Sequence, residues 1–116
     1  MLLDADINRL RHMAEAVQEI LHYAQGRTPQ SVLTDRPLQH LILRNLEILG
    51  EAASRISLPY RQEHPEILWR DMIDLRNRLI HVYFDLNLDV IWKTVKQDLP
   101  QMLPMLESLL DRERPR

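Results

Sequence analysis

The sequence predicts an all-α protein, a small antiparallel bundle of four to five helices in a single domain that spans residues 1–116. Composition is the first indication, because the 116 residues include 21 Leu but only 5 Val and 2 Gly. Leu favours helices over sheets, and so few glycines argue against hairpin-rich β folds and Gly-rich phosphate loops. The second indication is the spacing of the apolar residues, which recur at intervals of three and four. The length suits one core and leaves no room for a second domain.

Composition also excludes several classes of function. Cys is absent, which rules out disulfides, thiolate metal sites and a Cys nucleophile. With 15 Lys and Arg against 17 Asp and Glu, the net charge is −2, so the protein does not coat nucleic acid by bulk charge, and only a local basic patch could bind it. No apolar run approaches the ~20 residues of a membrane span, and the first residues lack the basic region of a signal peptide. We therefore expect a cytoplasmic protein without a membrane association.

The first predicted helix runs from about Asp4 to Gln25. Asp4 or Asp6 can cap its start, and Gly26 stands where a glycine commonly ends a helix. One stripe is apolar and is expected to face the core, whereas the opposite face is polar. The stripe consists of Ile7, Leu10, Ala14, Val17, Leu21 and Ala24, and the polar face of Arg9, Arg11, Glu15, Gln18 and Glu19.

A loop is predicted over residues 27–34, and the second helix is expected to begin near Thr34 or Asp35 with Pro37 in its first turn. This helix has a broad apolar face, and Gly50 lies in its middle at a cost of about 1 kcal/mol relative to Ala. Two interpretations of Gly50 are open. Either the helix simply tolerates it, or it marks the close approach of another helix, in the core or across a dimer.

Residues 58–65 predict an irregular connection, because Pro59 and Pro65 interrupt the helical pattern. The third helix is predicted from about Glu66 to His81.

The last helix is expected to follow a break around residues 84–87 and to begin near Asn87 or Asp89. Pro100 and Pro104 lie inside it, so either it kinks or a new helix starts at Pro100. The charged residues from Asp111 onward predict a frayed tail of about five residues.

The end of the third predicted helix holds the candidate catalytic residues. Arg76 offers a fork of donors that suits a phosphate, and His81 can take or give a proton near pH 7. Asn77 lies four residues before His81, so it can orient the imidazole or donate to a developing oxyanion. The set suits cleavage of RNA without a metal ion, in which a His deprotonates the 2′-hydroxyl and an Arg stabilises the charged phosphorane. The alternative is an ordinary helix end, where His and Arg favour the C-terminal dipole.

Helix geometry indicates that such a site needs a second contributor. Arg76 and His81 are about 140° apart around a helix axis, so a regular helix does not direct both at one small ligand. A fraying helix end or a second copy of the chain could bring them together. One His cannot easily act as both base and acid, and a symmetric homodimer would supply two. Arg70 and Arg78 add positive charge to the same segment and are candidate contacts to phosphate or RNA.

The remaining polar residues predict supporting roles. Glu47 and Glu51 lie one turn apart beside Gly50, either on a solvated face or as acids that hydrogen-bond the active helix. We expect Trp69 and Trp92 to anchor the core or an interface rather than to stack on bases. No two histidines are three or four residues apart, so the sequence predicts no metal site and no cofactor. The five are His12, His22, His40, His64 and His81.

The order and spacing of these residues resemble a known family. Arg76, His81 and Tyr83 match the R-x4-H-x-Y motif of HEPN-domain ribonuclease toxins, and Asn77 also fits. The similarity to the HepT-like branch of that superfamily covers nearly the whole chain. It includes the opening Asp6…Arg9…His12-Met13…Glu19-Ile20, residues 46–53 (LEILGEAA), Pro65 with Trp69, and residues 90–100 (VIWKTVKQDLP).

This resemblance implies an all-α homodimer in which the Arg/His motifs of both protomers line a cleft. It implies the toxin of a toxin–antitoxin pair, whose antitoxin is an MNT-type nucleotidyltransferase. The antitoxin is expected to silence the toxin by transferring AMP to the motif tyrosine, here Tyr83, within a larger hetero-oligomer. Two other functions stay open at this point: a non-catalytic helical module that binds the nucleotidyltransferase, and a nucleotide-binding regulator that uses the same Arg/His cleft.

Overall fold

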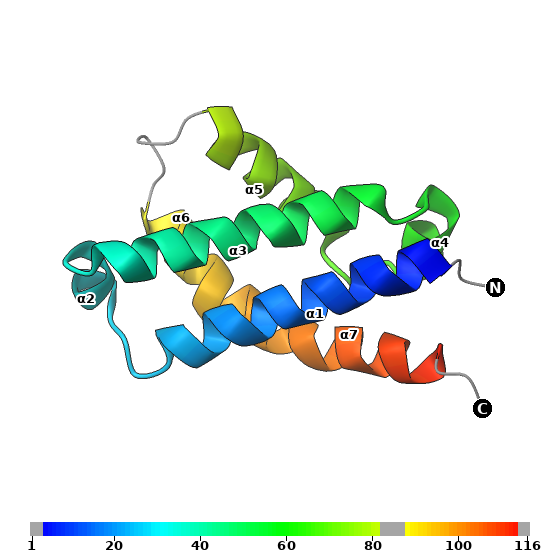
Figure 1. Cartoon of the computed structure of the whole chain (residues 1–116), viewed down its shortest axis with the longest axis horizontal. Helices are drawn as coiled ribbons and strands as arrows, with labels where there is room; N and C mark the ends of the chain where they lie inside the picture. Colours follow the sequence, from blue (N-terminus) through cyan, green and yellow to red (C-terminus); the bar gives the residue numbers. More distant parts are fainter. Residues whose placement is uncertain (1–3, 82–87, 114–116) are drawn as a thin grey trace.

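The computed structural model describes residues 4–81 and 88–113, and for Ile80, His81 and Leu88 it describes the backbone alone. The ordered elements of these residues are all helices, which confirms the predicted all-α class. Two long antiparallel helices, α1 (Asp4–Ala24) and α3 (Arg36–Arg55), lie side by side through the middle of the molecule (Figure 1). Helix α1 begins at the predicted residue, and α3 begins one residue after the predicted Asp35. Gly26 ends the first of them with a φ of 74°, a conformation that favours glycine.

Helix α3 begins where its cap predicts. The Asp35 side chain accepts a hydrogen bond from the Leu38 backbone N–H at 3.1 Å, and Pro37 lies in the first turn. The apolar stripes of α1 and α3 pack against each other, and α1 also packs against the C-terminal helix. The largest fully buried side chains are Leu10, Met13, Ile20, Ile42, Leu46, Leu49, Ile56, Leu79, Leu99, Met102, Leu106 and Leu109.

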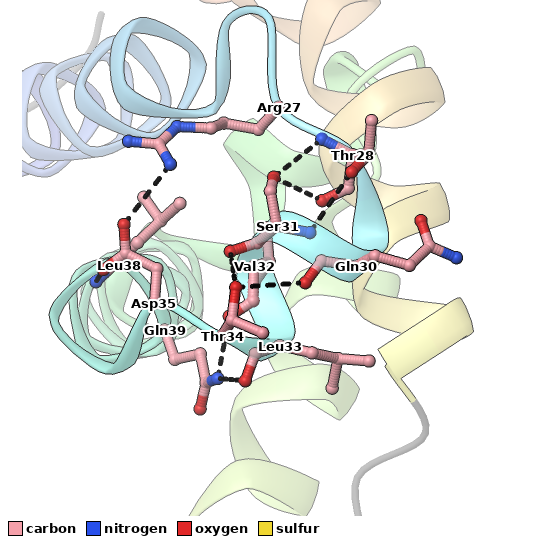
Figure 2. A network of polar contacts seen from close by, with 10 residues as sticks. All are labelled: Arg27, Thr28, Gln30, Ser31, Val32, Leu33, Thr34, Asp35, Leu38 and Gln39. Carbon is pink, nitrogen blue, oxygen red and sulfur yellow. Dashed lines mark hydrogen bonds and ion pairs between the residues drawn. The ribbon is translucent and has the colours of Figure 1, made fainter.

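The prediction of a loop over residues 27–34 is wrong, because a short helix, α2 (Pro29–Leu33), occupies most of this segment. Thr28 and Ser31 form a reciprocal capping box, in which each side chain accepts a hydrogen bond from the other's backbone N–H. The Gln39 side-chain amide then donates to the Val32 carbonyl at 2.7 Å and ties α2 to α3 (Figure 2). One turn of helix is too short to show periodicity, and Pro29 marks its start rather than a loop.

A second short helix, α4 (Leu58–Glu63), replaces the irregular connection predicted over residues 58–65. Asp6 of α1 accepts a hydrogen bond at 3.2 Å from the Ser57 N–H just before it, which joins the starts of the two helices. Helix α5 (Trp69–His81) then begins three residues later than predicted. Trp69 is buried as expected, and its indole N–H donates to the His64 carbonyl at 2.8 Å.

The last predicted helix is divided into three parts: α6 (Leu88–Lys93), the π-helical stretch η1 (Thr94–Asp98) and α7 (Leu99–Arg112). The backbone N–H of Leu99 donates to the Thr94 carbonyl, five residues back, as a π turn requires. A new α-helix therefore starts one residue before Pro100, and Pro104 lies inside it. The predicted start of the frayed tail, at Asp111, is too early in the sequence, since α7 continues through Asp111 and Arg112.

The helices divide into a core group and one outlying helix. α1 packs on both α3 and α7, whereas α5 packs mainly on α3 and crosses it, so that its C-terminal end projects away from the rest of the bundle (Figure 1). Across residues 4–81 and 88–113, none of the helices combines the length and apolar character that crossing a membrane requires.

Candidate active site

A groove with a volume of ≈ 350 Å³ lies where α1, α3 and α5 meet. Each helix contributes charged side chains to it, and Arg76 is the contribution of α5. The lining residues are Arg9, His12, Arg44, Glu47, Ile48, Glu51, Ala52, Arg55 and Arg76. The groove thus contains the predicted phosphate-binding arginine and both predicted supporting acids.

Gly50 is what allows α5 to come so close to α3. A Cβ atom added at this position would lie 2.6 Å from the Met72 carbonyl oxygen and closer still to the Cβ of Arg76. Real Cβ atoms essentially never make such contacts. The second interpretation of Gly50, the close approach of another helix within the core, is therefore confirmed. This approach sets the position of the Arg76 backbone over the groove.

Glu51, the next residue of α3, holds the side chain of Arg76. Its Oε2 lies 3.0 Å from Nη1 of Arg76, and its Oε1 accepts a hydrogen bond from Nε of Arg55 at 2.7 Å. The hydrogen bond from Arg55 and the charges of Arg76, Arg55 and Arg9 lower the pKa of the Glu51 carboxyl below its ordinary value of 4.5. Glu51 is therefore ionised at neutral pH, and it links α3 to α5 although 44% of its side chain stays exposed.

Glu47 has a more local partner. It lies 3.7 Å from Nη1 of Arg44, one turn earlier on the same helix, and 21% of its side chain is exposed. Of the two acids considered at the sequence level, Glu51 contacts the helix that carries the motif, and Glu47 pairs within α3.

The structure does not gather all the predicted residues into this groove. Asn77 and Arg78 are exposed, and neither lines it. Arg70 borders a different hollow, on the side of α5 near α4. The helix is continuous as far as His81, so positions 76 and 81 keep the angular separation of a regular helix, about 140°. Tyr83 lies outside the described residues.

Four polar lining residues were not among the predicted site residues: Arg9 and His12 of α1, and Arg44 and Arg55 of α3. The prediction that Arg9 lies on an outer polar face is wrong, because Arg9 lines the groove and is only partly exposed. Its Nε atom and that of Arg76 are buried and have no hydrogen-bond partner among the described residues. Arg9 and His12 do belong to the opening segment that resembles the family, and this was the available signal.

The charge of the groove differs from that of the chain. Four arginines face two glutamates there, whereas the whole chain has a net charge of −2. Guanidinium groups with free donors suit phosphate oxygens. Within residues 4–81 and 88–113 no cluster of three or more His, Asp or Glu residues could hold a metal ion. The arrangement can therefore bind a phosphodiester through arginines.

Comparison with known proteins gives a consistent result. Residues 13–109 match the family described as "Ribonuclease HepT-like". A protein of Thermococcus cleftensis, provisionally named ribonuclease HepT, is 39% identical over 100 residues, which cover 86% of this chain and 91% of the relative. No solved structure matches the chain.

Two further relatives are provisionally named as RNases. One, from Caldanaerobacter subterraneus, is 27% identical over 105 residues, or 90% of this chain and 94% of the relative. The other, from Methanocaldococcus jannaschii, is 30% identical over 98 residues, or 84% of this chain and 90% of the relative.

Proposed function

The chain belongs to the HepT-like family of ribonucleases, and we propose that it is the toxin of a toxin–antitoxin pair, an endoribonuclease that cuts RNA without a metal ion. The family favours this function over the non-catalytic module and the nucleotide-binding regulator. The proposed site is formed by Arg76, Asn77 and His81 at the cleft of a cytoplasmic homodimer.

One observation carries the proposal: the guanidinium of Arg76 is held by Glu51 in a groove where positive charge exceeds negative charge. Only 20% of the Arg76 side chain is exposed, so its position is restricted before any substrate binds. A restricted donor needs little reorganisation when charge develops on the phosphate during reaction. Arg76 is therefore suited to bind the scissile phosphate and to stabilise the transition state.

In the proposed reaction, one phosphorus–oxygen bond forms, to the 2′ oxygen, and one breaks, to the 5′ oxygen. His81 of one protomer removes the proton of the 2′-hydroxyl, whose oxygen attacks the adjacent phosphorus while Arg76 stabilises the added negative charge. The bond to the 5′ oxygen breaks, and the second His81 of the dimer protonates that oxygen. The products are a cyclic phosphate and a 5′-hydroxyl. Asn77, one turn before His81, orients the imidazole, and Arg70 and Arg78 are candidate contacts to the rest of the RNA.

Control of the toxin is proposed to come from an MNT-type nucleotidyltransferase that transfers AMP to Tyr83. The added phosphate would compete with RNA for Arg76, and the nucleotide would obstruct the cleft, so modification inhibits. Intact-mass measurement after incubation with the partner enzyme and ATP tests this step on the parent and on Tyr83→Phe.

The decisive experiment replaces His81 with Ala. Loss of a general acid/base costs roughly 10²–10⁴-fold in rate, so we expect RNA cleavage and growth inhibition to disappear while the circular dichroism spectrum is unchanged. Addition of EDTA to the parent should have no effect. Light scattering should give about 28 kDa, twice the 13.8 kDa of one chain. Cleavage by His81→Ala at the parent rate, with contaminating nuclease excluded, would show that the assignment is wrong.

A further inference from the structure

The groove holds more positive charge than a single scissile phosphate needs. Glu51 already neutralises one guanidinium, yet Arg9, Arg55 and Arg76 all act on its carboxylate. Arg44 stands at 3.7 Å from Glu47, a long contact that leaves 72% of the Arg44 side chain exposed. The guanidinium groups of the groove therefore keep hydrogen-bond donors that the internal ion pairs do not use.

Arg9 is the clearest case of an arginine with an unused hydrogen-bond donor. It comes from α1, far in sequence from the motif, and its Nε atom is buried without a hydrogen-bond partner among the described residues. A buried donor without an acceptor is destabilising, so a ligand oxygen that accepts a hydrogen bond from it would stabilise the complex. The Nε atom of Arg76, on α5, is also buried and without a hydrogen-bond partner in the described part of the chain.

We propose that Arg9, with Arg44 and Arg55 beside it, forms a second phosphate subsite that holds the backbone of a single-stranded RNA next to the phosphate bound by Arg76. This inference rests on the proposed ribonuclease function and adds to it the residues that bind the substrate away from the reacting bond. The subsite lies on α1 and α3, whereas the proposed catalytic residues all lie on α5.

The spacing of two arginines along the groove favours a strand over a free nucleotide. Arg44 and Arg55 are eleven residues apart on α3, or about 16 Å along its axis, which is longer than one phosphate group. A strand carries one phosphate per nucleotide and can contact both arginines at once, whereas a free nucleotide carries its phosphate at one end.

The lining residues also predict that the subsite does not distinguish between bases. None of its described lining residues is Trp, Tyr or Phe, so no large aromatic ring is there to stack on a base. Contacts made by arginines to phosphates carry no sequence information. The subsite should therefore bind RNA with little regard to its bases, and any sequence preference must arise elsewhere.

The test measures RNA binding separately from cleavage. A labelled single-stranded RNA of about twelve nucleotides is titrated, over a salt series, with the full-length protein carrying His81→Ala so that it is not cut. Adding Arg9→Gln should raise Kd on the order of tenfold and reduce the slope of log K against log salt by about 0.7. Arg11→Gln is the matched control, because Arg11 is exposed on the same helix, bonds Asn8 and does not line the groove.

The outcomes separate the subsite from the proposed function. Equal binding by the Arg9 and Arg11 variants, or no RNA binding at all, would overturn the subsite. Arg9-dependent binding by a parent protein that never cuts RNA would keep the subsite and reject the catalytic proposal. If Arg9→Gln does not fold, Arg44→Gln and Arg55→Gln on exposed side chains should each reduce the salt slope. Displacement of the RNA by AMP at micromolar concentration would overturn the assignment to a strand.

Discussion

Helix α5 presents Arg76 toward α3 and Arg70 toward a second hollow, and the surroundings of these two arginines differ. The groove around Arg76 is the smaller one, ≈ 350 Å³ against ≈ 580 Å³, but four arginines face two glutamates in it. In the second hollow the charges balance, because Asp71 and Asp74 accompany Arg61 and Arg70. Arg76 is restrained by a neighbouring carboxylate, whereas Arg70 is exposed. Excess charge and restraint, rather than size, distinguish the candidate active site.

The largest expected effect of this difference is on catalysis. Arg76→Gln removes a donor directed at the developing charge and should lower kcat by roughly 10²–10³-fold. Arg70→Gln removes a charge with no fixed geometry, so it should change only KM and the salt dependence, by a few-fold. Steady-state kinetics on a short RNA measures both. A loss of kcat in Arg70→Gln as large as in Arg76→Gln would mean that the two surroundings are functionally equivalent.

The second effect is on stability, and its sign is informative. In an unconstrained helix, Gly→Ala stabilises by about 1 kcal/mol. Gly50→Ala should instead destabilise by about 1–3 kcal/mol, since the new methyl group collides with the Met72 carbonyl and with Arg76 and must push α5 away. Urea unfolding measures the change in the free energy of unfolding. A more stable variant would show that α5 does not need this close approach.

A smaller effect is expected when Glu51 loses its charge. Glu51→Gln keeps the shape of the side chain but releases Arg76, so kcat should fall severalfold. The groove becomes more positive at the same time, and Kd for RNA should improve by about two- to fivefold, the scale of one exposed ion pair. Glu19→Gln, on an exposed position of α1 outside the groove, is the charge-matched control. If kcat and Kd both match the control, Glu51 does not position Arg76.

The smallest effect is on the pH dependence of stability. The pKa of Glu51 is lowered in the folded protein, so its ionised form stabilises the fold above its ordinary value of 4.5. This contribution is lost as the pH falls below 4.5 and through the folded-state pKa. Because 44% of the side chain is exposed, we expect less than about 1 kcal/mol. The difference in unfolding free energy between parent and Glu51→Gln should shrink from pH 6 to pH 3, and a difference that grows would contradict the assignment.

The sequence predicted the long elements because periodicity needs several turns to be visible. α1 and α3 have long apolar stripes and recognisable caps, and their starts were placed correctly. The short helices α2 and α4 were missed, since one turn has no period and a proline at a helix start resembles a loop signal. Pro100 predicted the start of α7 to within one residue, but the π turn before it was not predicted, since residues 94–98 contain neither Gly nor Pro.

The candidate site was predicted only along a single helix. Arg76 belongs to a motif that is local in sequence, and Glu51 is adjacent to Gly50, a helical glycine that can indicate a close helix contact. Arg9 and Arg55 come from other helices, and only the packing of α1, α3 and α5 brings them to Arg76. A helical wheel places Arg9 on an outer face because it takes account of one helix at a time. It cannot show the residues that α3 and α5 bring to the same groove.

The π turn at Thr94–Asp98 also has a consequence for how the gene can vary in length. A π turn is, in effect, an α-helix that has accepted one additional amino acid without turning its two flanks out of phase. Elsewhere in a buried helix, loss of one codon would rotate everything beyond it by about 100° and bring polar side chains into the core. Within this stretch the same deletion would leave an ordinary α-helix, with Ile91 before it and Met102 after it still directed inward. Among the helices that the structure describes, the stretch Thr94–Asp98 is thus where the loss of a single residue is most easily accommodated.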